Sequence, residues 1–461
     1  MYLRDNVFLP RWIAAGGSWL LLQAPALWNG FPLLQYDSGG YLARWYEGIL
    51  VPSRAVVYGL MLWASVPLAL WPVLLLQSAL TVWIVALMLR AHGCGGRPWL
   101  VFGVTAVLSV FTTLPFLTSI LLTDIFCGLS VLALYLLLLR SDALTRAERI
   151  GLIALVAVSS ATHSATFAVL LALLAASWFV WVINRTRIPV RALGRGIAAL
   201  VLGAMLVFAA DYAVAKRFAW TPGGFALSFG RMLQDGIVQK YLDEHCPAAK
   251  LKLCAHKDAL PGDADTWFWG SALFDRLGRF AGMNDEMQAI ALASLTEYPA
   301  LQAKTAALAT LKQLVAVHSG EGVVTWIWHT YAIVDRYTPQ LAPAMRAARQ
   351  QHGEVGFAAI NRVHYPLALF AMLMLPVVAF AARRGPIAPE FGELAATVML
   401  ALCTNAFVCG ALSNPHDRYG ARLVWLAGFT GALAIVRYLA QARDIPSAPY
   451  AATELPSSAL S

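Results

Sequence analysis

The chain has 461 residues, of which 59% are hydrophobic and only 13% are charged. An ordinary soluble domain carries about 25% charged residues, so this composition excludes that class and is typical of a polytopic membrane protein. Lys and Arg total 34 against 25 Asp and Glu, which could suggest an anionic partner. All seven lysines lie between Lys216 and Lys312, however, and the arginines cluster at the ends of apolar segments. This distribution indicates membrane orientation and argues against nucleic-acid binding.

Apolar segments near the length of a bilayer span recur along the chain. They predict an all-α protein with ten transmembrane helices, near residues 12–28, 71–90, 98–114, 117–139, 150–163, 165–183, 196–213, 363–382, 393–412 and 420–437. Ten spans place all the arginine clusters on one side, namely Arg4 and Arg11; Arg90 and Arg97; Arg140, Arg146 and Arg149; Arg185, Arg187, Arg191 and Arg195; Arg383 and Arg384; Arg437 and Arg443. The positive-inside rule makes that side, and both termini, cytoplasmic. We therefore expect a multi-pass protein of the cytoplasmic (inner) membrane.

Three local features refine this topology. Residues 55–70 are apolar, but a crossing there would move the later arginine clusters outside, so we expect a juxtamembrane or re-entrant helix. The run from Gly151 to Ile183 has ~33 residues, well above one bilayer span, so we expect a tight hairpin near Ser160 to Ser164. The first apolar segment lacks a small-residue cleavage site, and no cleavable signal peptide is expected.

The composition becomes that of a mixed, soluble-like domain between about Val214 and Arg362. We expect this domain to be extracytoplasmic, mainly helical and inserted between helices 7 and 8. Helical periodicity at 284–295 and 301–317 is interrupted at Tyr298-Pro299, where proline removes a backbone donor. The expected organisation is an N-terminal bundle at 1–213 with a first outer loop at 29–56, the inserted domain at 214–362, C-terminal helices at 363–440 and a cytoplasmic tail at 441–461.

Two cysteines, Cys246 and Cys254, fall in the inserted domain. A disulfide is expected because an oxidising compartment permits it and the turn at Pro247 brings the two ends together. The alternatives are free thiols, or a metal site with His245 and His256. Four such ligands would crowd one zinc ion, and the CxxC spacing of many zinc sites is missing.

The first outer loop is the most distinctive polar stretch. Asp37 lies between Tyr36 and Tyr41, beside a Gly-Gly pair, and is followed by Arg54 and Tyr58. Such a loop, just beyond a membrane face, can direct an acid and cations at a ligand near the lipid head groups. The alternative is a solvated loop with interfacial aromatic residues.

Further polar residues lie near the same face. Asp124 is near the outer end of its helix, where an ionisable group is costly unless it faces a cavity or a partner; the alternative is a helix N-terminal acid favoured by the dipole. His163, at the apex of the hairpin, is suited to donate a hydrogen bond to a phosphate or a sugar. The alternative is a hydrogen-bonded structural residue. Asp211 and Tyr212 end the seventh span and mark the interface.

The last outer loop, residues 413–422, is a second polar cluster containing His416, Arg418, Tyr419 and Arg422. Guanidinium groups bind phosphate oxygens in a bidentate fork, so this loop suits a lipid-linked phosphate. The alternative is a capping turn held by salt bridges.

Four short features of the outer loops and of the residues next to the spans together resemble the GT-C superfamily. They are Tyr36-Asp37 in the first outer loop, Ser53-Arg54 followed by Tyr58, Asp124 at the outer start of a helix, and Arg418-Tyr419 before the final span. The superfamily comprises integral-membrane glycosyltransferases such as protein mannosyltransferases and the lipid A aminoarabinose transferase. The resemblance covers roughly residues 1–215 and 360–440. The chain departs from it in having one acid beside Tyr36 where many members have an acidic pair, and in the position of its soluble domain.

The resemblance implies an activity and roles for residues. The implied activity is transfer of a sugar from a polyprenyl-phosphate donor to an envelope glycolipid, polysaccharide or protein at the outer face of the cytoplasmic membrane. Asp37 is then the catalytic carboxylate, and Arg54 and Arg418 bind the donor phosphate. From the polar clusters themselves we expect His416 to join these arginines, and the substrate pocket to comprise Tyr36, Tyr41, Tyr58, Asp124, His163 and Tyr419. No cofactor is firmly implied, and the need for a divalent metal stays open, as does the acceptor class.

Other functions remain as alternatives. In a membrane transporter or lipid flippase for envelope precursors, Asp124, His163 and Asp211 would form a proton or substrate path. No inverted repeat is visible, however, and the polar residues lie at one face, whereas transporters place their sites near the midplane. A polymerase or ligase of lipid-linked glycans and a non-catalytic envelope scaffold are further alternatives.

Overall fold

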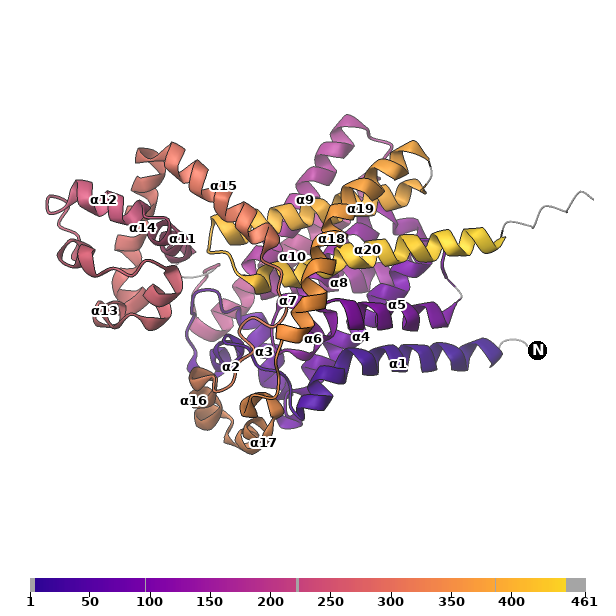
Figure 1. Ribbon diagram of the computed structural model, residues 1–461, viewed down its shortest axis with the longest axis horizontal. Helices are drawn as coiled ribbons and strands as arrows, with labels where there is room; N and C mark the ends of the chain where they lie inside the picture. Colours follow the sequence, from indigo (N-terminus) through magenta and orange to yellow (C-terminus); the bar gives the residue numbers. More distant parts are fainter. Residues whose placement is uncertain (1–4, 96, 221–223, 386, 445–461) are drawn as a thin grey trace, which may run out of the picture.

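The computed structural model describes residues 5–95, 97–220, 224–385 and 387–444. The described chain is helical, and its β-pairing is limited to isolated bridges. Most of the predicted tail, from residue 445 onward, lies outside the described residues. Figure 1 shows a long helical bundle with a smaller helical unit at one end.

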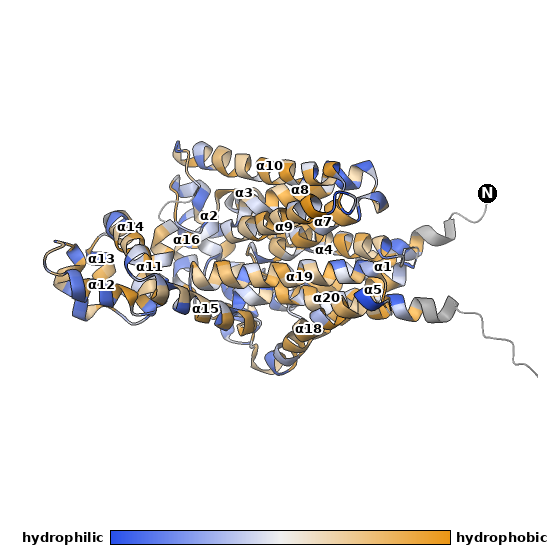
Figure 2. Ribbon diagram, turned by 90° about the horizontal axis from the view of Figure 1, so that it is seen from above, coloured by the Kyte–Doolittle hydropathy of each residue, from blue (hydrophilic) through white to orange (hydrophobic). Residues whose placement is uncertain are grey.

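The bundle is built from ten principal helices: α1 (Asp5–Asn29), α4 (Trp71–Ala91), α5 (Pro98–Phe111), α7 (Asp124–Leu139), α8 (Arg146–Thr162), α9 (Ser164–Ile183), α10 (Val190–Ala215), α18 (Ala358–Arg384), α19 (Pro389–Ala406) and α20 (Asp417–Asp444). Six of the described helices are long and apolar enough to cross a membrane: α4, α9, α10, α18, α20, and α19 together with its π-helical end η7 (Phe407–Ala411). Apolar residues dominate the bundle in Figure 2. The chain is therefore an all-α membrane protein, and the count of ten spans stays a prediction.

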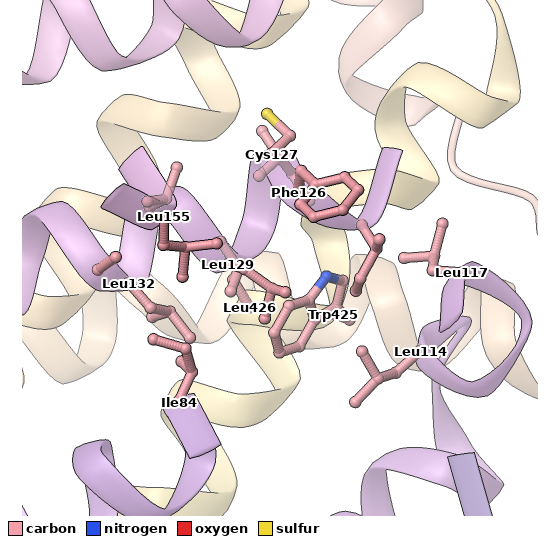
Figure 3. Packing of buried hydrophobic residues seen from close by; sticks show 14 of the residues in the cluster. Ile84, Leu114, Leu117, Phe126, Cys127, Leu129, Leu132, Leu155, Trp425 and Leu426 are labelled. Atoms are coloured by element: carbon pink, nitrogen blue, oxygen red, sulfur yellow. The ribbon is translucent and has the colours of Figure 1, made fainter. Parts of the chain in front are cut away.

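Helix α7 forms the centre of the bundle. Every side chain from Asp124 to Leu138 is buried, which fits an apolar helix surrounded by other helices. Close packing against α20 requires a glycine, because a Cβ on Gly128 would lie 2.8 Å from the Trp425 ring. Figure 3 shows Trp425 and Leu426 beside Phe126 and other apolar residues of this core.

The predicted hairpin at the end of α8 is confirmed. Helix α8 ends at Thr162 and α9 begins at Ser164. Arg140, before α8, and Arg187, after α9, both pair with Glu393, at N–O distances of 2.7 and 3.9 Å. The chain therefore reverses at His163 and returns to the end of the bundle from which it came.

Within the described residues, the arginine clusters gather at one end of the bundle. Arg90 pairs with Glu148, Arg195 donates to Ser141, and Arg437 donates to the Gly93 carbonyl. Helix α1 begins and α20 ends at this same end (Figure 1). The polar outer loops lie at the opposite end.

Short helices form that opposite end: α2 (Ser38–Glu47), α3 (Val56–Ser65), η1 (Val66–Leu68) and α6 (Leu114–Ser119). With ten residues, α3 is half as long as the ~20 residues of a spanning helix. Its length supports the juxtamembrane interpretation of 55–70.

The predicted helix at 117–139 is interrupted. Helix α6 ends at Ser119, and α7 starts at Asp124. Between them the backbone pairs with the first outer loop, since Leu33 donates to the Ser119 carbonyl and Leu121 donates to the Leu33 carbonyl. This contact was not visible in the local pattern, and it fixes Asp124 in the first turn of α7.

The first part of the insertion is a helical unit with its own core, built around Phe229, Trp267 and Phe274. It contains α11 (Gly224–Gln234), α12 (Ile237–His245), η3 (Lys252–Ala259), η4 (Thr266–Gly270), α13 (Ala272–Arg276), α14 (Arg279–Glu297) and α15 (Pro299–Val315). The break between α14 and α15 falls at Tyr298-Pro299, as predicted. The Cys246–Cys254 disulfide is also present, which removes the alternatives of free thiols and a metal site for this pair.

The second part of the insertion belongs to the bundle. It contains α16 (Trp328–Tyr337), η5 (Pro339–Leu341), α17 (Ala342–Ala347) and η6 (Arg349–His352). Val323, Ile327 and Ile333 join the hydrophobic core of the bundle. Gln350 exchanges hydrogen bonds with the backbone of Leu34, at 2.9 and 2.7 Å. The segment predicted as one domain at 214–362 therefore consists of a separate helical unit and a cap on the outer loops.

Candidate active site

A buried carboxylate joins the first and last outer loops. Asp37, only 8% exposed, directly precedes α2. Arg54 donates a hydrogen bond to its Oδ1 atom, and Nη1 of Arg418 donates to Oδ2 at 2.6 Å. Asp37 and Arg54, predicted from the first outer loop, and Arg418, predicted from the last, therefore form one ion-paired cluster.

The two arginines decide the charge of Asp37. Burial alone would raise the pKa of this carboxyl group, but the positive charges of Arg418 and Arg54 outweigh burial and lower the pKa to about 2. The group is therefore ionised at neutral pH. A carboxylate in this state can accept a proton once one of its oxygen atoms is free.

Packing positions the first outer loop. Gln35 accepts from the Asp37 backbone N–H at 2.8 Å, and Ser38 donates to the Leu121 carbonyl at 2.9 Å. The Gly-Gly pair is needed for space, because a Cβ would lie 2.7 Å from Thr330 at Gly39 and 2.9 Å from Arg54 at Gly40. The loop is therefore packed around Asp37 and is not the solvated loop of the alternative interpretation.

The last outer loop is fixed by two acids of the insertion. Nδ1 of His416 lies 2.7 Å from Glu321, and Nε2 lies 3.5 Å from Asp265. Glu321 also accepts from the Arg418 backbone N–H at 2.7 Å. Burial would lower the pKa of His416, but hydrogen bonds to Asp265 and Glu321 raise it to about 10. His416 is thus a protonated support for Arg418, and the structure gives no separate reason to place it on a phosphate.

The predicted tyrosines occupy different environments. Tyr41 and Tyr58 are buried edge to face, with ring centroids 5.2 Å apart. The guanidinium of Arg54 lies 5.8 Å from the Tyr41 ring, and that of Arg418 lies 4.8 Å from the Tyr419 ring. Tyr36 is largely exposed. Tyr41 and Tyr419 therefore support the arginines, whereas Tyr58 belongs to the core.

Asp124 and His163 meet at Arg422. The Arg422 guanidinium is fully buried, 3.8 Å from Asp124 and 3.4 Å from Nδ1 of His163. His163 also accepts from the Ala165 backbone N–H at 3.2 Å and so caps α9. The structural roles given as alternatives, a helix N-terminal acid and a hydrogen-bonded histidine, are thus both observed. Both residues nevertheless line hollow space next to the Asp37 cluster.

A cavity of about 300 Å³ lies on the Arg54 side of the cluster. Its wall is formed mainly by residues 50–57, by the turn between α8 and α9 and by residues in the range 408–413, with Val207 and Asp211 of α10. Arg54, His163 and Tyr419 line it, together with Asp211, which the sequence interpretation assigned to the membrane interface or, in a transporter, to a proton or substrate path. On the Arg418 side there is a narrow gap lined by Gln35, Thr113, Leu117, Ile120, Leu122, Asp124, Gly320, Glu321, Arg418 and Ala421.

Three residues of the insertion that the sequence interpretation missed complete the site. Glu321 and Asp265 hold His416, and the exposed Trp269 ring lies 5.9 Å from the Arg54 guanidinium. Their contacts with the outer loops are long-range and leave no local pattern. Within the described ranges, no group of three or more His, Cys, Asp or Glu residues could hold a metal ion.

Comparison with known proteins adds no assignment: no family model, no curated protein and no solved structure matches the chain. The functional argument therefore depends on the geometry of the site and on the resemblance described above.

Proposed function

We propose that the protein is a membrane glycosyltransferase of the GT-C type. It would transfer a sugar from a polyprenyl-phosphate donor to an envelope glycolipid, polysaccharide or protein at the outer face of the cytoplasmic membrane. The observation that carries the proposal is the buried Asp37 carboxylate, paired with Arg54 and Arg418, beside a cavity at one end of an apolar helix bundle. These groups supply a base and two cations at the position where a lipid-linked phosphate meets water.

The reaction uses these groups in a balanced way. The acceptor hydroxyl oxygen forms a bond to C1 of the sugar while the bond from C1 to the phosphate oxygen breaks. Asp37 takes the hydroxyl proton, and the electron pair of the broken bond leaves with polyprenyl phosphate. The arginines stabilise the negative charge that grows on this leaving group, a term that often dominates such catalysis.

Donor binding would also activate the base. Both Asp37 oxygens accept hydrogen bonds from guanidinium groups in this structure. A donor phosphate in the 300 Å³ cavity competes for Arg54, because phosphate and carboxylate bind the same fork of donors. When Arg54 turns to the phosphate, Oδ1 of Asp37 is released to accept the acceptor proton.

Substitution of Asp37 tests this function. Asp37→Asn should lower transfer by at least about 10²-fold, the usual contribution of a general base, while the donor still binds. The amide keeps the shape of the side chain but cannot take the proton. The measurement is glycan product, together with binding of a polyprenyl-phosphate sugar, using purified variants with matched thermal unfolding.

Asp335→Asn is the matched control, since Asp335 forms an exposed ion pair with Arg346 far along the chain from the cluster. It should retain wild-type transfer. Wild-type product from Asp37→Asn would contradict the catalytic role. Failure of the wild-type protein to bind any polyprenyl-phosphate sugar would remove the donor assignment.

The transporter or flippase alternative has one observation in its favour. Arg422 links Asp124 to His163, and His163 shares its cavity with Asp211. In a transporter Asp124 or Asp211 would be the sensitive acid, so Asp124→Asn or Asp211→Asn would abolish transport and Asp37→Asn would have little effect. Comparison of Asp37→Asn with the variants at the transporter acids therefore distinguishes the two functions.

A further inference from the structure

A second and larger cavity lies between α5, α18 and α20. It has a volume of about 1010 Å³ and opens on the apolar surface of the bundle, where Val107, Phe111, Phe370 and Ile435 of its wall are exposed. Nearly all of the wall is apolar, including the buried residues Leu375 and Val424. An apolar space of this size that opens on an apolar surface holds hydrocarbon more readily than water. The cavity therefore suits an apolar occupant.

The dimensions and position of the cavity indicate a membrane lipid. Its wall extends along α20 from Val424 to Tyr438, which at 1.5 Å per residue is about 21 Å, or two thirds of a ~30 Å hydrocarbon core. Two of its walls, α18 and α20, are candidate membrane spans, and α18 is mostly unburied in the protein. A hydrocarbon chain can therefore reach the cavity from the bilayer.

The end of the cavity near the outer loops is polar and uncharged. Ser319 Oγ lies 3.1 Å from Nδ1 of His364, whose Nε2 lies 3.2 Å from the Val110 carbonyl. Because the carbonyl only accepts, Nε2 carries the proton, and Nδ1 accepts from the serine hydroxyl. The Ser319 oxygen can then accept a hydrogen bond from a hydroxyl group. Thr112 and Thr113 lie at the same end.

This polar end leads toward the base. Thr113 lines both the large cavity and the narrow gap beside Asp124, Glu321 and Arg418. The 300 Å³ cavity approaches the cluster from the other side, at Arg54. The narrow gap and the 300 Å³ cavity thus flank Asp37 through its two arginine partners, Arg418 and Arg54. This arrangement fits a displacement at C1 in which the acceptor attacks one face of the sugar and the phosphate leaves from the opposite face. Such a displacement inverts the configuration at C1.

We infer that the large cavity holds the hydrocarbon chain of the acceptor, and that the acceptor is a membrane lipid with an uncharged, hydroxyl-bearing head group. This inference rests on the proposed function and narrows its acceptor class. Charge complementarity favours the acceptor over the donor, because two carboxylates, Asp124 and Glu321, line the gap with one cation, Arg418, whereas the other cavity has one of each, Arg54 and Asp211. A donor phosphate would meet these acids, but a neutral hydroxyl would not be repelled.

Two glycines allow the cavity to be filled without a clash. A Cβ at Gly103 or at Gly431 meets no atom within 4 Å, and both glycines line the cavity. Gly103→Phe and Gly431→Trp should therefore place a ring in the space for the lipid chain. Gly16→Trp is the matched control, because Gly16 on α1 also has no neighbour within 4 Å but is not part of this wall.

The probe is a monoacylglycerol with a photoreactive group in its chain, bound to the full-length purified protein. Labelling should map to α5, α18 or α20 and fall at least tenfold in Gly103→Phe and Gly431→Trp, but not in Gly16→Trp. Binding of a polyprenyl-phosphate sugar should be unchanged in all three variants. Ser319→Ala should weaken labelling by a monoacylglycerol more than labelling by the corresponding alkane.

Each other outcome has a definite meaning. Loss of donor binding in the filled variants, or displacement of the probe by polyprenyl phosphate, would assign the cavity to the donor chain and overturn the inference. Labelling that the filled variants do not reduce would also overturn it. If the wild-type protein binds the probe in the cavity but binds no polyprenyl-phosphate sugar, the proposed glycosyl transfer fails while the lipid site itself stands.

Discussion

Asp37 is held by the same two groups that a departing phosphate would attract. Its carboxylate is buried, which disfavours its charge, and is paired on both oxygens, which restores it. Removal of one guanidinium by a substrate therefore has two effects at once, since the substrate gains a charge-assisted hydrogen bond and the base gains a free oxygen. Binding of the donor and activation of Asp37 as a base would therefore occur together.

Loss of one arginine should shift the pH dependence of activity. In Arg418→Gln, burial continues to raise the pKa of Asp37 while one lowering charge is gone, so the pKa rises from about 2. Because the base must be ionised, the variant should lose kcat/KM at acidic pH values where the wild-type protein keeps it. The pH profile of kcat/KM between about pH 4 and pH 8 measures the shift.

The matched variant is Arg346→Gln, which removes an arginine from an exposed pair with Asp335. Its profile should match that of the wild-type protein. An acidic limb that is unchanged in Arg418→Gln would show that the charge of Arg418 does not set the ionisation of the base.

The residues that the sequence could identify are those whose chemistry conflicts with their surroundings. Asp37, Arg54 and Arg418 stand out because they follow or precede apolar spans, and the structure brings them together. The sequence could not show that both ring nitrogens of His416 are paired with acids, Glu321 and Asp265. Those acids lie 95 and 151 positions away in the chain and contact His416 only in the tertiary fold. Contacts of this kind require the packing of the insertion on the bundle.

At the scale of helices, boundaries set by local rules were predictable. The proline at 299 starts α15, and the hairpin before Ser164 follows from the length of the apolar run. The break between α6 and α7 was not predictable, because it depends on pairing with Leu33. Apolar composition alone also does not distinguish α7, which is buried all round, from helices that face lipid.

Close approach at Gly420 links α20 to the segment that carries Glu321. A Cβ at Gly420 would lie 2.0 Å from the Ala316 carbonyl oxygen, and this backbone must then move. Gly420→Ala should therefore displace residues 316–321, loosen the support of Arg418 and reduce both thermal stability and transfer. Stability should fall by about 1–3 kcal/mol, the range for overpacking a close contact.

Gly194→Ala is the control, because a Cβ at Gly194 in α10 meets nothing within 4 Å. Alanine is favoured over glycine inside a helix, so this variant should be equal to the wild-type protein or slightly more stable. Thermal unfolding in detergent and the transfer assay measure both variants. Equal stability of the two variants would contradict the proposed role of the close contact.

At the scale of the whole molecule, the charges separate along the bundle. The arginine clusters meet Glu148 and Glu393 at one end, and the Asp37 cluster lies at the other. The insertion adds to this polarity, since its first unit contributes Asp265 and Trp269 to the site and its second part packs on the outer loops. Composition predicted the insertion as one domain because neither described part holds a helix long and apolar enough to cross a membrane. The tertiary contacts distinguish the two parts.

This polarity predicts the orientation of the protein in the membrane. By the positive-inside rule the arginine end should be cytoplasmic, which places both ends of the described bundle inside and the Asp37 cluster with the Cys246–Cys254 disulfide outside. Reporters inserted after Arg140, Arg195 and Arg384 should score as cytoplasmic, and one inserted after Cys254 should score as extracytoplasmic. Each position needs a paired reporter that is active only on the opposite side, so that a silent fusion is distinguished from an unfolded one. A cytoplasmic signal after Cys254 would place the carboxylate and both arginines inside the cell, and transfer at the outer face would then be impossible.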